Sequence, residues 1–364
     1  MVKLKLRRSS SVKKTTKAAA RTKSKQPAPE KPVRLRDLAE YLGLNPSTIS
    51  VVLNDTPGRS IPEETRRRIK EAAKLLNYQP NLVARSFRSS RTLNIGIMVP
   101  VLSDGYHTEI MTGAGDCLVN AGYFYYTAHH RHRPNLIEQY SKQLVAKGAE
   151  GLICIDTALE HPLPVPVVAI AGHRHIKNVT NISLDHRRAA ELTLHHLYSL
   201  GHRRIAFMHG QPFSSDSEDR WRGIVDVCGE LRLEMHPELI MHLDRDVSTP
   251  ELGYPVIEKL TTGKQKFTAL VCFNDVAAIG AIRGLRDRGL RVPEDISVIG
   301  FDDIKAAAFL TPGLTTIRQP LAEMGRYAAQ YIVNRLNRTE GFKDNVSFEP
   351  ELVIRESTSQ AKRS

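Results

Sequence analysis

Long apolar runs and targeting signals are scarce in this chain of 364 residues. No stretch reaches the 18 or so apolar residues that a membrane-spanning helix needs. The basic start of the chain is followed by no apolar run, which a secretory signal would require. These absences predict a cytoplasmic protein without a membrane partner.

Cysteine is also sparse, with four residues that are far apart and never spaced as a metal-binding or redox pair. Each lies in an apolar stretch, which is typical of reduced core thiols rather than disulfides or metal ligands. The four are Cys117, Cys154, Cys228 and Cys272.

Catalytic motifs are missing as well. The sequence contains no recognisable nucleophile–base set, phosphate-binding loop or metal-ligand spacing. His129, His130 and His132 could suggest a metal site, but they share a loop with two arginines. We therefore expect no catalytic residue, no metal and no cofactor, and we interpret the chain as a protein other than an enzyme.

Positive charge, by contrast, is abundant and lies at one end. The chain holds 52 Lys and Arg against 39 Asp and Glu, a net charge of +13. Residues 1–31 carry +10 and residues 32–91 carry +5, which leaves −2 for residues 92–364. A basic end on a nearly neutral body indicates a polyanionic partner, nucleic acid before membrane.

Composition divides the chain into five segments. Residues 1–31 have few large apolar side chains and should form a disordered basic tail, which we expect to strengthen binding to DNA of any sequence. Residues 32–78 have helical periodicity, and residues 79–91 form a short connector. Residues 92–358 alternate strand and helix patterns, and residues 359–364 form a C-terminal tail.

Short apolar runs separated by amphipathic helices indicate parallel sheets with helices on both faces. Residues 92–358 form a segment that is long for a single sheet. We therefore expect an α/β sensor of two doubly wound lobes with a cleft between them. The expected strands are Ile95–Val99, Phe124–Thr127, Gly151–Ile155, Val167–Ile170, Ile205–Met208, Ala269–Cys272 and Ile296–Ile299.

The segment 32–78 predicts an all-α helix-turn-helix head. Apolar residues at 35, 38, 39 and 42 form the stripe of a short helix, which Gly43 can end in a left-handed conformation. Asn45 is a good N-cap and Pro46 suits the first position of a second helix, which should run to about Asn54. Such a second helix enters the major groove of DNA.

The sequence also predicts which side of each helix is buried and which is exposed. In the second helix, Ile49, Val52 and Leu53 should point inward, while four residues should face outward. These four are Ser47, Thr48, Ser50 and Val51. A third helix should begin near Pro62, with an acidic first turn and a buried stripe. The stripe comprises Ile69, Ala72, Ala73, Leu75 and Leu76.

From residue 33 to about 358 the sequence resembles the lactose/galactose repressor family. In the head the resemblance rests on Arg36-Asp37-Leu38-Ala39, Ser47–Asn54, Glu63–Arg66 and Leu76–Ser86. In the sensor it rests on Leu200–Phe207, Arg220 with Gly223, Phe273-Asn274-Asp275, Val298–Asp303, Thr315–Pro320 and Leu352–Ser357. The resemblance implies a homodimeric transcription regulator with a periplasmic-binding-protein-like sensor.

By this resemblance, residues early in the second helix touch base edges, here Pro46, Ser47 and Val51. Many relatives carry Arg where Val51 stands, so the usual bidentate contact of Arg with guanine is absent. The candidates for phosphate contacts are Arg34, Thr48, Ser50 and Asn81. Asn54 is also assigned to DNA binding.

The connector matches a family segment that folds on DNA and enters the minor groove, where a large apolar residue wedges a central step. The matching residue here is Phe87, and the alternative is that Phe87 only packs at the junction of head and sensor. The connector residues that we assign to DNA binding are Asn81, Ala84, Arg85, Phe87 and Arg88.

In the sensor, ligands should lie off the carboxyl ends of the strands. The resemblance implies an effector, sugar-like or a related metabolite, in the cleft. The candidate residues are Tyr106, His107, Ser214, Asp216, Arg220, Asn274 and Asp302.

Several of these residues have alternative roles. Asn274 and Asp302 could simply cap helices, and Arg220 could form an ordinary ion pair with Asp216 or Asp219. His202 is expected to support a turn rather than to bind a ligand. Relatives frequently have an Asp after the strand Val167–Ile170, where this chain has Ala171-Gly172-His173.

The sequence therefore predicts a repressor whose affinity for a palindromic DNA operator is controlled by a small molecule. A solute-binding protein for transport is a rival, opposed by the head. An architectural DNA protein with a vestigial sensor is another, opposed by the retained polar residues of the cleft. A generic three-helix domain that binds protein is the alternative for the head.

Overall fold

The computed structural model describes residues 33–55, 59–79, 91–102, 105–171, 176–339 and 345–362. The expected basic tail, the connector residues 80–90 and Gly172-His173 lie outside these ranges. The contacts between residues divide the chain into two compact units, residues 1–85 and residues 86–364. They are described separately below as the head and the sensor.

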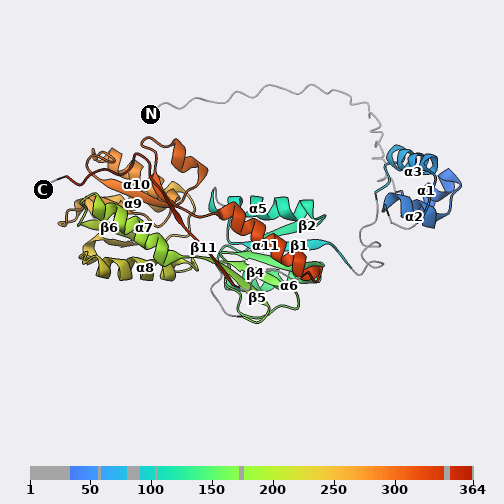
Figure 1. The fold of residues 1–364 in the computed structure, drawn as a ribbon, viewed down its shortest axis with the longest axis horizontal. Helices are drawn as coiled ribbons and strands as arrows, with labels where there is room; N and C mark the ends of the chain where they lie inside the picture. Colours follow the sequence, from blue (N-terminus) through green and yellow to red (C-terminus); the bar gives the residue numbers. More distant parts are fainter. Residues whose placement is uncertain are drawn as a thin grey trace, which may run out of the picture. The chain divides into compact units, whose positions relative to one another are not determined.

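In the described residues of the head, three helices surround a small apolar core (Figure 1). Leu38, Ile49, Val52 and Ile69 are fully buried, and they come from all three helices. The helices are α1 (Leu35–Leu42), α2 (Pro46–Leu53) and α3 (Glu63–Leu75). Their bounds agree with the sequence prediction.

Two predicted orientations in the head are wrong. Leu75, expected in the buried stripe of α3, is 71% exposed. It follows Ile69 by six residues, which at about 100° per residue carries it well off the buried side. Ser50, expected to face outward, is buried, because α2 packs against both α1 and α3 and so buries more than a single stripe.

The sensor contains two parallel-type sheets, each the centre of one lobe (Figure 1). In lobe 1 the strand order is β11-β5-β4-β3-β1-β2, and all neighbours are parallel. The elements of lobe 1 are β1 (Asn94–Val99), α5 (Tyr106–Asn120), β2 (Phe124–His129), α6 (Pro134–Ala146), β3 (Ala149–Ile155), β4 (Val167–Ile170), β5 (Val179–Leu184), α11 (Leu321–Leu336) and β11 (Val346–Phe348).

In lobe 2 the strand order is β12-β10-β9-β8-β6-β7, and only β12 runs antiparallel to its neighbour. Three short 3-10 helices accompany the regular elements. The elements of lobe 2 are α7 (His186–Ser199), β6 (Ile205–His209), α8 (Ser217–Glu230), η1 (Pro237–Leu239), β7 (Ile240–His242), η2 (Pro250–Leu252), α9 (Tyr254–Thr262), β8 (Ala269–Val271), α10 (Asp275–Asp287), β9 (Ser297–Asp302), η3 (Lys305–Phe309), β10 (Thr315–Arg318) and β12 (Glu351–Val353).

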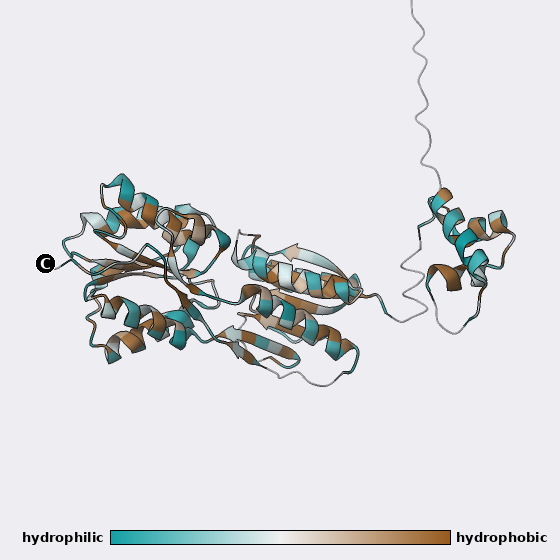
Figure 2. Cartoon of the chain, turned by 45° about the horizontal axis from the view of Figure 1, so that its top comes forward, coloured by the Kyte–Doolittle hydropathy of each residue, from teal (hydrophilic) through white to brown (hydrophobic). Residues whose placement is uncertain are grey.

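Strand periodicity explains why each sheet is covered on both faces. In β1, Ile95, Ile97 and Val99 belong to the core beneath α5 and α11, whereas Met98 joins the core beneath α6. Alternate residues of a strand point to opposite faces, so an uninterrupted apolar run fills both cores. Figure 2 shows hydrophobic residues along the strands and on the helix sides turned towards them.

Five strands were not predicted, and their composition explains why. Thr315 and Thr316 of β10 are fully buried although polar, because their hydroxyl and amide groups bond to Asp275 and Ser357. The other four are short or of mixed polarity. They are β5, β7, β11 and β12.

Three chain crossings join the lobes: β5 to α7, β10 to α11, and β11 to β12. Leu184, Ala189, Phe301 and Ile317 form a small buried cluster at these crossings. The amide of Asp185 also donates to the carbonyl of Phe348, at 3.0 Å. The lobes are therefore joined along one side, and the cleft lies at the carboxyl ends of the strands.

Candidate functional site

The turn between α1 and α2 has the expected chemistry. Gly43 ends α1 with φ of 63°, in the left-handed region. The side chain of Asn45 accepts a hydrogen bond from the amide of Ser47 at 2.9 Å, and Pro46 occupies the first position of α2. These contacts fix the start of the second helix, the part that would enter a DNA groove.

The outer side of α2 presents few long side chains. Pro46 and Ser47 are exposed, while Thr48 and Val51 are half-buried. Asn54 is held by Ser50, because its Nδ2 donates to the carbonyl oxygen of Ser50 at 2.6 Å and to its hydroxyl at 3.2 Å. Ser50 is therefore a poor candidate for a phosphate contact.

Arg34 precedes α1 and is exposed. Its backbone amide donates to the carboxylate of Asp37 at 2.7 Å, which leaves the guanidinium on the surface. The remaining predicted DNA-binding residues lie outside the described ranges. They are Asn81, Ala84, Arg85, Phe87 and Arg88.

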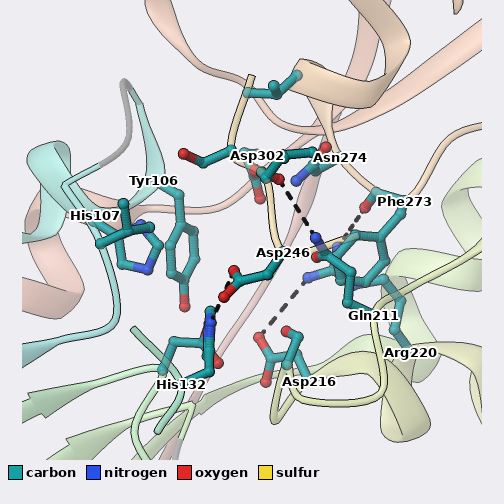
Figure 3. Close-up of a pocket in the computed structure, with 16 residues that line it drawn as sticks. Tyr106, His107, His132, Gln211, Asp216, Arg220, Asp246, Phe273, Asn274 and Asp302 are labelled. Atoms are coloured by element: carbon teal, nitrogen blue, oxygen red, sulfur yellow. Dashed lines mark hydrogen bonds and ion pairs between the residues drawn. The ribbon is translucent and has the colours of Figure 1, made fainter. Parts of the chain in front are cut away.

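All seven predicted effector residues line one cavity between the two lobes, which encloses about 730 Å³ including space open to solvent (Figure 3). Nine further residues complete its wall: Val101, His132, Asp156, Gln211, Asp246, Val247, Ser248, Phe273 and Val276.

The predicted residues reach the cavity from strand ends and helix starts. Tyr106 and His107 open α5 after β1, and Ser214 and Asp216 lie between β6 and α8. Asp302 is the last residue of β9. The carboxyl ends of parallel strands meet along one edge of each sheet, so residues distant in sequence converge there.

Arg220, on α8, is buried at the back of the cavity. Its Nη1 donates to the carbonyl oxygen of Phe273 at 2.6 Å, and its Nη2 lies 3.8 Å from Oδ2 of Asp216. The guanidinium carbon lies 4.6 Å from the ring centroid of Phe273 and 3.6 Å from that of Phe301. Arg220 therefore pairs with Asp216, whereas Asp219 pairs with Arg222.

Asp302 has an unusual backbone, with φ of 114°. Its Oδ1 accepts from Nε2 of Gln319 at 2.6 Å, and the described structure shows no helix cap formed by its side chain. Burial raises the pKa of Asp302 to about 7, although the charge of Arg220 opposes the shift.

Asn274 performs the capping role that was its alternative. Its Oδ1 accepts from the amide of Ala277 at 2.8 Å and so caps α10. The residue also lines the cavity, and its amide nitrogen is directed there in Figure 3. Capping and contact with a ligand are thus compatible at this position.

Tyr106 and His107 form the opposite wall, in lobe 1. Their rings meet edge to face with centroids 5.0 Å apart. Burial lowers the pKa of His107 to about 4 and raises that of Tyr106 well above its ordinary value, so both are neutral near pH 7.

His132 and Asp156 were not predicted as effector residues. Oδ1 of Asp156 accepts from the amide and hydroxyl of Ser215 in lobe 2, at 3.1 and 2.8 Å. Nε2 of His132 lies 3.6 Å from Oδ2 of Asp156, and its Nδ1 lies 3.2 Å from Oδ1 of Asp246 in lobe 2. The net pKa of Asp156 is lowered, because the nearby imidazole of His132 and the hydrogen bonds from Ser215 outweigh the opposite effect of burial.

Asp156 supplies a carboxylate near the end of β4, where the sequence was expected to lack one. It follows β3, the strand beside β4, so a carboxylate is present one strand away. The sequence signal was an Asp directly after a buried strand, the same signal that identified Asp302.

The other histidines of this loop have structural contacts. Nε2 of His130 bonds to the hydroxyl of Thr157 at 2.8 Å, and His129 is exposed. Within the described residues, no group of three or more His, Cys, Asp or Glu could hold a metal ion. His202 supports a turn, as expected, through Thr268 at 2.8 Å and the carbonyl of Ser359 at 3.0 Å.

Within the described ranges, no helix is both long and apolar enough to cross a membrane. Cys154, Cys228 and Cys272 are buried core side chains, and burial raises the pKa of each thiol. Cys117 is half-buried, with its sulfur 3.6 Å from Oε1 of Gln330.

Comparison with known proteins gives one family match in the head and one in the sensor. Residues 34–81 match the family of bacterial regulatory proteins called lacI, and residues 194–358 match a periplasmic binding protein-like domain. The transcriptional repressor PurR of Haemophilus influenzae (strain KW20 / Rd) is 30% identical over 336 residues, which cover 89% of this chain and 98% of the repressor. PurR of Aliivibrio fischeri (strain MJ11) is 31% identical, with 89% and 97% covered.

Solved structures agree in fold. The Lac repressor dimer bound to operator and the anti-inducer ONPF has a TM-score of 0.79 at 26% identity, with 90% of this chain and all of that chain covered. The complex of the regulator CelR with cellobiose has a TM-score of 0.66 at 25% identity, with 89% and 99% covered. This chain belongs to the lacI family of bacterial regulatory proteins, as a DNA-binding transcriptional regulator with an effector-binding sensor.

Proposed function

We propose that the chain acts as a homodimeric repressor whose affinity for a palindromic operator changes when a small, sugar-like effector fills the cleft. It acts by binding, in the cytoplasm, and catalyses no reaction. The observation that carries the proposal is the convergence of seven sequence-predicted residues on one interlobe cavity.

A ligand in the cavity can affect the relative position of the two lobes, because both lobes line the cavity. Tyr106 and His107 come from lobe 1, while Arg220, Asn274 and Asp302 come from lobe 2. A ligand that contacts both walls stabilises one relative position of the lobes. It can shift the operator equilibrium only through such differential contacts, and operator DNA must change ligand affinity by the same factor.

The test titrates a fluorescent operator duplex with the full-length protein, with and without members of a panel of sugars, nucleosides and their derivatives. We expect at least one compound to change operator affinity in the wild-type protein. Arg220→Ala and Asp302→Ala should bind operator without that response. Arg222→Ala is the matched control, because Arg222 lies on the same helix with its side chain 70% exposed.

Thermal unfolding gives a second readout. A compound at 100 times its dissociation constant should stabilise the folded protein by about 2.7 kcal/mol. A full ligand-dependent change of operator affinity in Arg220→Ala or Asp302→Ala would remove that residue from the site. A wild-type operator affinity that no compound alters, over a panel whose members do bind, would contradict the sensor function.

A further inference from the structure

The cavity between the lobes carries more acidic than basic side chains. Among the described residues, its wall holds four aspartates but one guanidinium, that of Arg220, and burial raises the pKa of one of these aspartates, Asp302, to about 7 (Figure 3). Of its two imidazoles, only His132 has a raised pKa, since burial holds that of His107 at about 4. The four carboxylates are Asp156, Asp216, Asp246 and Asp302.

The charge of Arg220 is already matched inside the protein. Asp216 lies 3.8 Å away, and the carboxylate of Asp302 interacts with the same guanidinium. One nitrogen, Nε, is buried without a hydrogen-bond partner among the described residues. Arg220 can therefore donate to a ligand oxygen, but it adds no net positive charge to the cavity.

Among the described residues, the basic side chains near the cavity do not reverse this balance, although Nε2 of His186, which does not line the cavity, lies 3.2 Å from Oδ1 of Asp216. Arg131 and Arg133 flank His132 in sequence, but both are exposed and neither lines the cavity. Arg245 precedes Asp246 and is directed to Glu251, at 4.0 Å, with half of its side chain in solvent. Exposed charges are screened by water and salt, and this holds for Asp246 as well as for these arginines. The more buried carboxyl groups of Asp156, Asp216 and Asp302 are screened far less.

The described part of the wall therefore offers a ligand many acceptors and little positive charge. Hydroxyl and amino groups can donate to the carboxylates, whereas a phosphate or carboxylate would face like charges in a partly desolvated space. Tyr106 and Phe273 add aromatic surface, and Val101, Val247 and Val276 add aliphatic surface. A compact ring with hydroxyl groups fits this combination.

Resting on the function proposed above, we propose that the effector is a polyhydroxy compound that is uncharged or carries an amino group. Phosphorylated and carboxylated derivatives are excluded by the acidic side chains on both walls. The structure thus separates free sugars, amino sugars and nucleosides from sugar phosphates and nucleotides.

The first test uses one matched triplet and two matched pairs of compounds with the full-length dimer, and binding is measured by isothermal titration and thermal shift. The triplet is glucose, glucosamine and glucose 6-phosphate, and the pairs are ribose with ribose 5-phosphate and adenosine with its 5′-monophosphate. For any parent that binds, we expect the phosphate to bind at least tenfold more weakly and an amino derivative to bind at least as well. A phosphate that binds more tightly than its parent, in wild type and Arg222→Ala but not in Arg220→Ala, would overturn the proposal.

The second test needs no effector. Cationic and anionic nitroxides of equal size are added to protein with labelled valine methyl groups, and NMR relaxation is compared. The cationic probe should relax Val101, Val247 and Val276 more than the anionic probe does. Val225, 42% exposed on the surface of α8, serves as the reference. Asp246→Asn, at a half-exposed side chain, should reduce the difference.

The two tests separate failure of this inference from failure of the sensor function. Equal relaxation by the two probes, or stronger relaxation by the anion, would overturn the acidic cavity and leave the sensor function standing. A cationic preference together with binding compounds that never change operator affinity would support the inference and contradict the sensor function.

Discussion

His132 of lobe 1 and Asp246 of lobe 2 form a pair across the mouth of the cleft, with 3.2 Å between Nδ1 and Oδ1. The ring of Phe213, also from lobe 2, lies 4.5 Å from the imidazole centroid. On the other side, Nε2 of His132 faces Asp156 at 3.6 Å. One imidazole thus connects both lobes.

This pair predicts a pH-dependent cleft. Burial lowers the pKa of His132, but Asp156 and Asp246 outweigh it, so the net pKa lies above the ordinary 6.5. The stabilising charge pair is therefore present below about pH 6.5 and is lost as pH rises through the higher folded value. His107 and His130, with pKa values of about 4, stay neutral over this range.

NMR titration of the imidazoles checks this directly. Asp246→Asn should lower the pKa of His132 and weaken the association of the lobes near pH 6. His196, whose pKa burial lowers and which lies away from the pair, should titrate unchanged. An unchanged pKa of His132 in Asp246→Asn would mean that the two lobes do not meet at this pair.

Arg220→Lys should weaken effector binding although it keeps the charge. A lysine has no second donor equivalent to Nε, the Arg220 nitrogen that is left for a ligand oxygen while Nη1 donates to the carbonyl of Phe273. Loss of one charged hydrogen bond is worth about 1.5–3 kcal/mol, so affinity should fall by about tenfold or more. Isothermal titration with a compound found by the panel measures it, and wild-type affinity would show that the planar group is not used.

The contact between α5 and α11 predicts a stability effect in lobe 1. A Cβ added at Gly113 would lie 1.9 Å from the carbonyl oxygen of Ala322, and one added at Gly325 would lie 2.0 Å from that of Ile110. Backbone atoms cannot move aside cheaply. Gly113→Ala should therefore destabilise the protein by about 1–3 kcal/mol or more.

Gly229 in α8 is the matched control, because nothing lies within 4 Å of its added Cβ. Gly229→Ala should be neutral or stabilise by up to about 1 kcal/mol, since alanine is the better helix former. Thermal unfolding of both variants measures the contrast. Equal midpoints for Gly113→Ala and wild type would mean that the two helices can separate without cost.

The sequence was most informative where local chemistry decides the structure. Gly43 and Asn45 predicted the turn of the head, because a left-handed residue and an N-cap act within a few residues. The effector candidates were found because polar residues after buried strands converge at one sheet edge.

Residues whose role depends on the packing of lobes or helices could not be found in this way. His132 belongs to the cavity only because Asp246, 114 residues later, lies opposite. Ser50 and Leu75 were misassigned because the width of the buried side of a helix depends on its neighbours. Strand β10 was missed because its buried threonines bond to partners that are distant in sequence.

The last prediction concerns the reading helix of the head. Val51 is half-buried, lies about one turn of α2 after the exposed Ser47, and has no polar group with which to read a base. Val51→Arg should create a preference for guanine at one position of each half-site, because a bidentate Arg discriminates by about 1–3 kcal/mol. Selection from random DNA before and after the change measures the preference.

A second variant separates position from charge. Leu75→Arg adds the same guanidinium on α3, at a side chain that is already 71% exposed. Its charge should strengthen binding to all DNA modestly and make it more salt-dependent, while the selected consensus stays that of the wild type. If Val51→Arg also left the consensus unchanged, or if Leu75→Arg shifted it equally, Val51 would not face the bases, and the order of elements in the groove would have to be reconsidered.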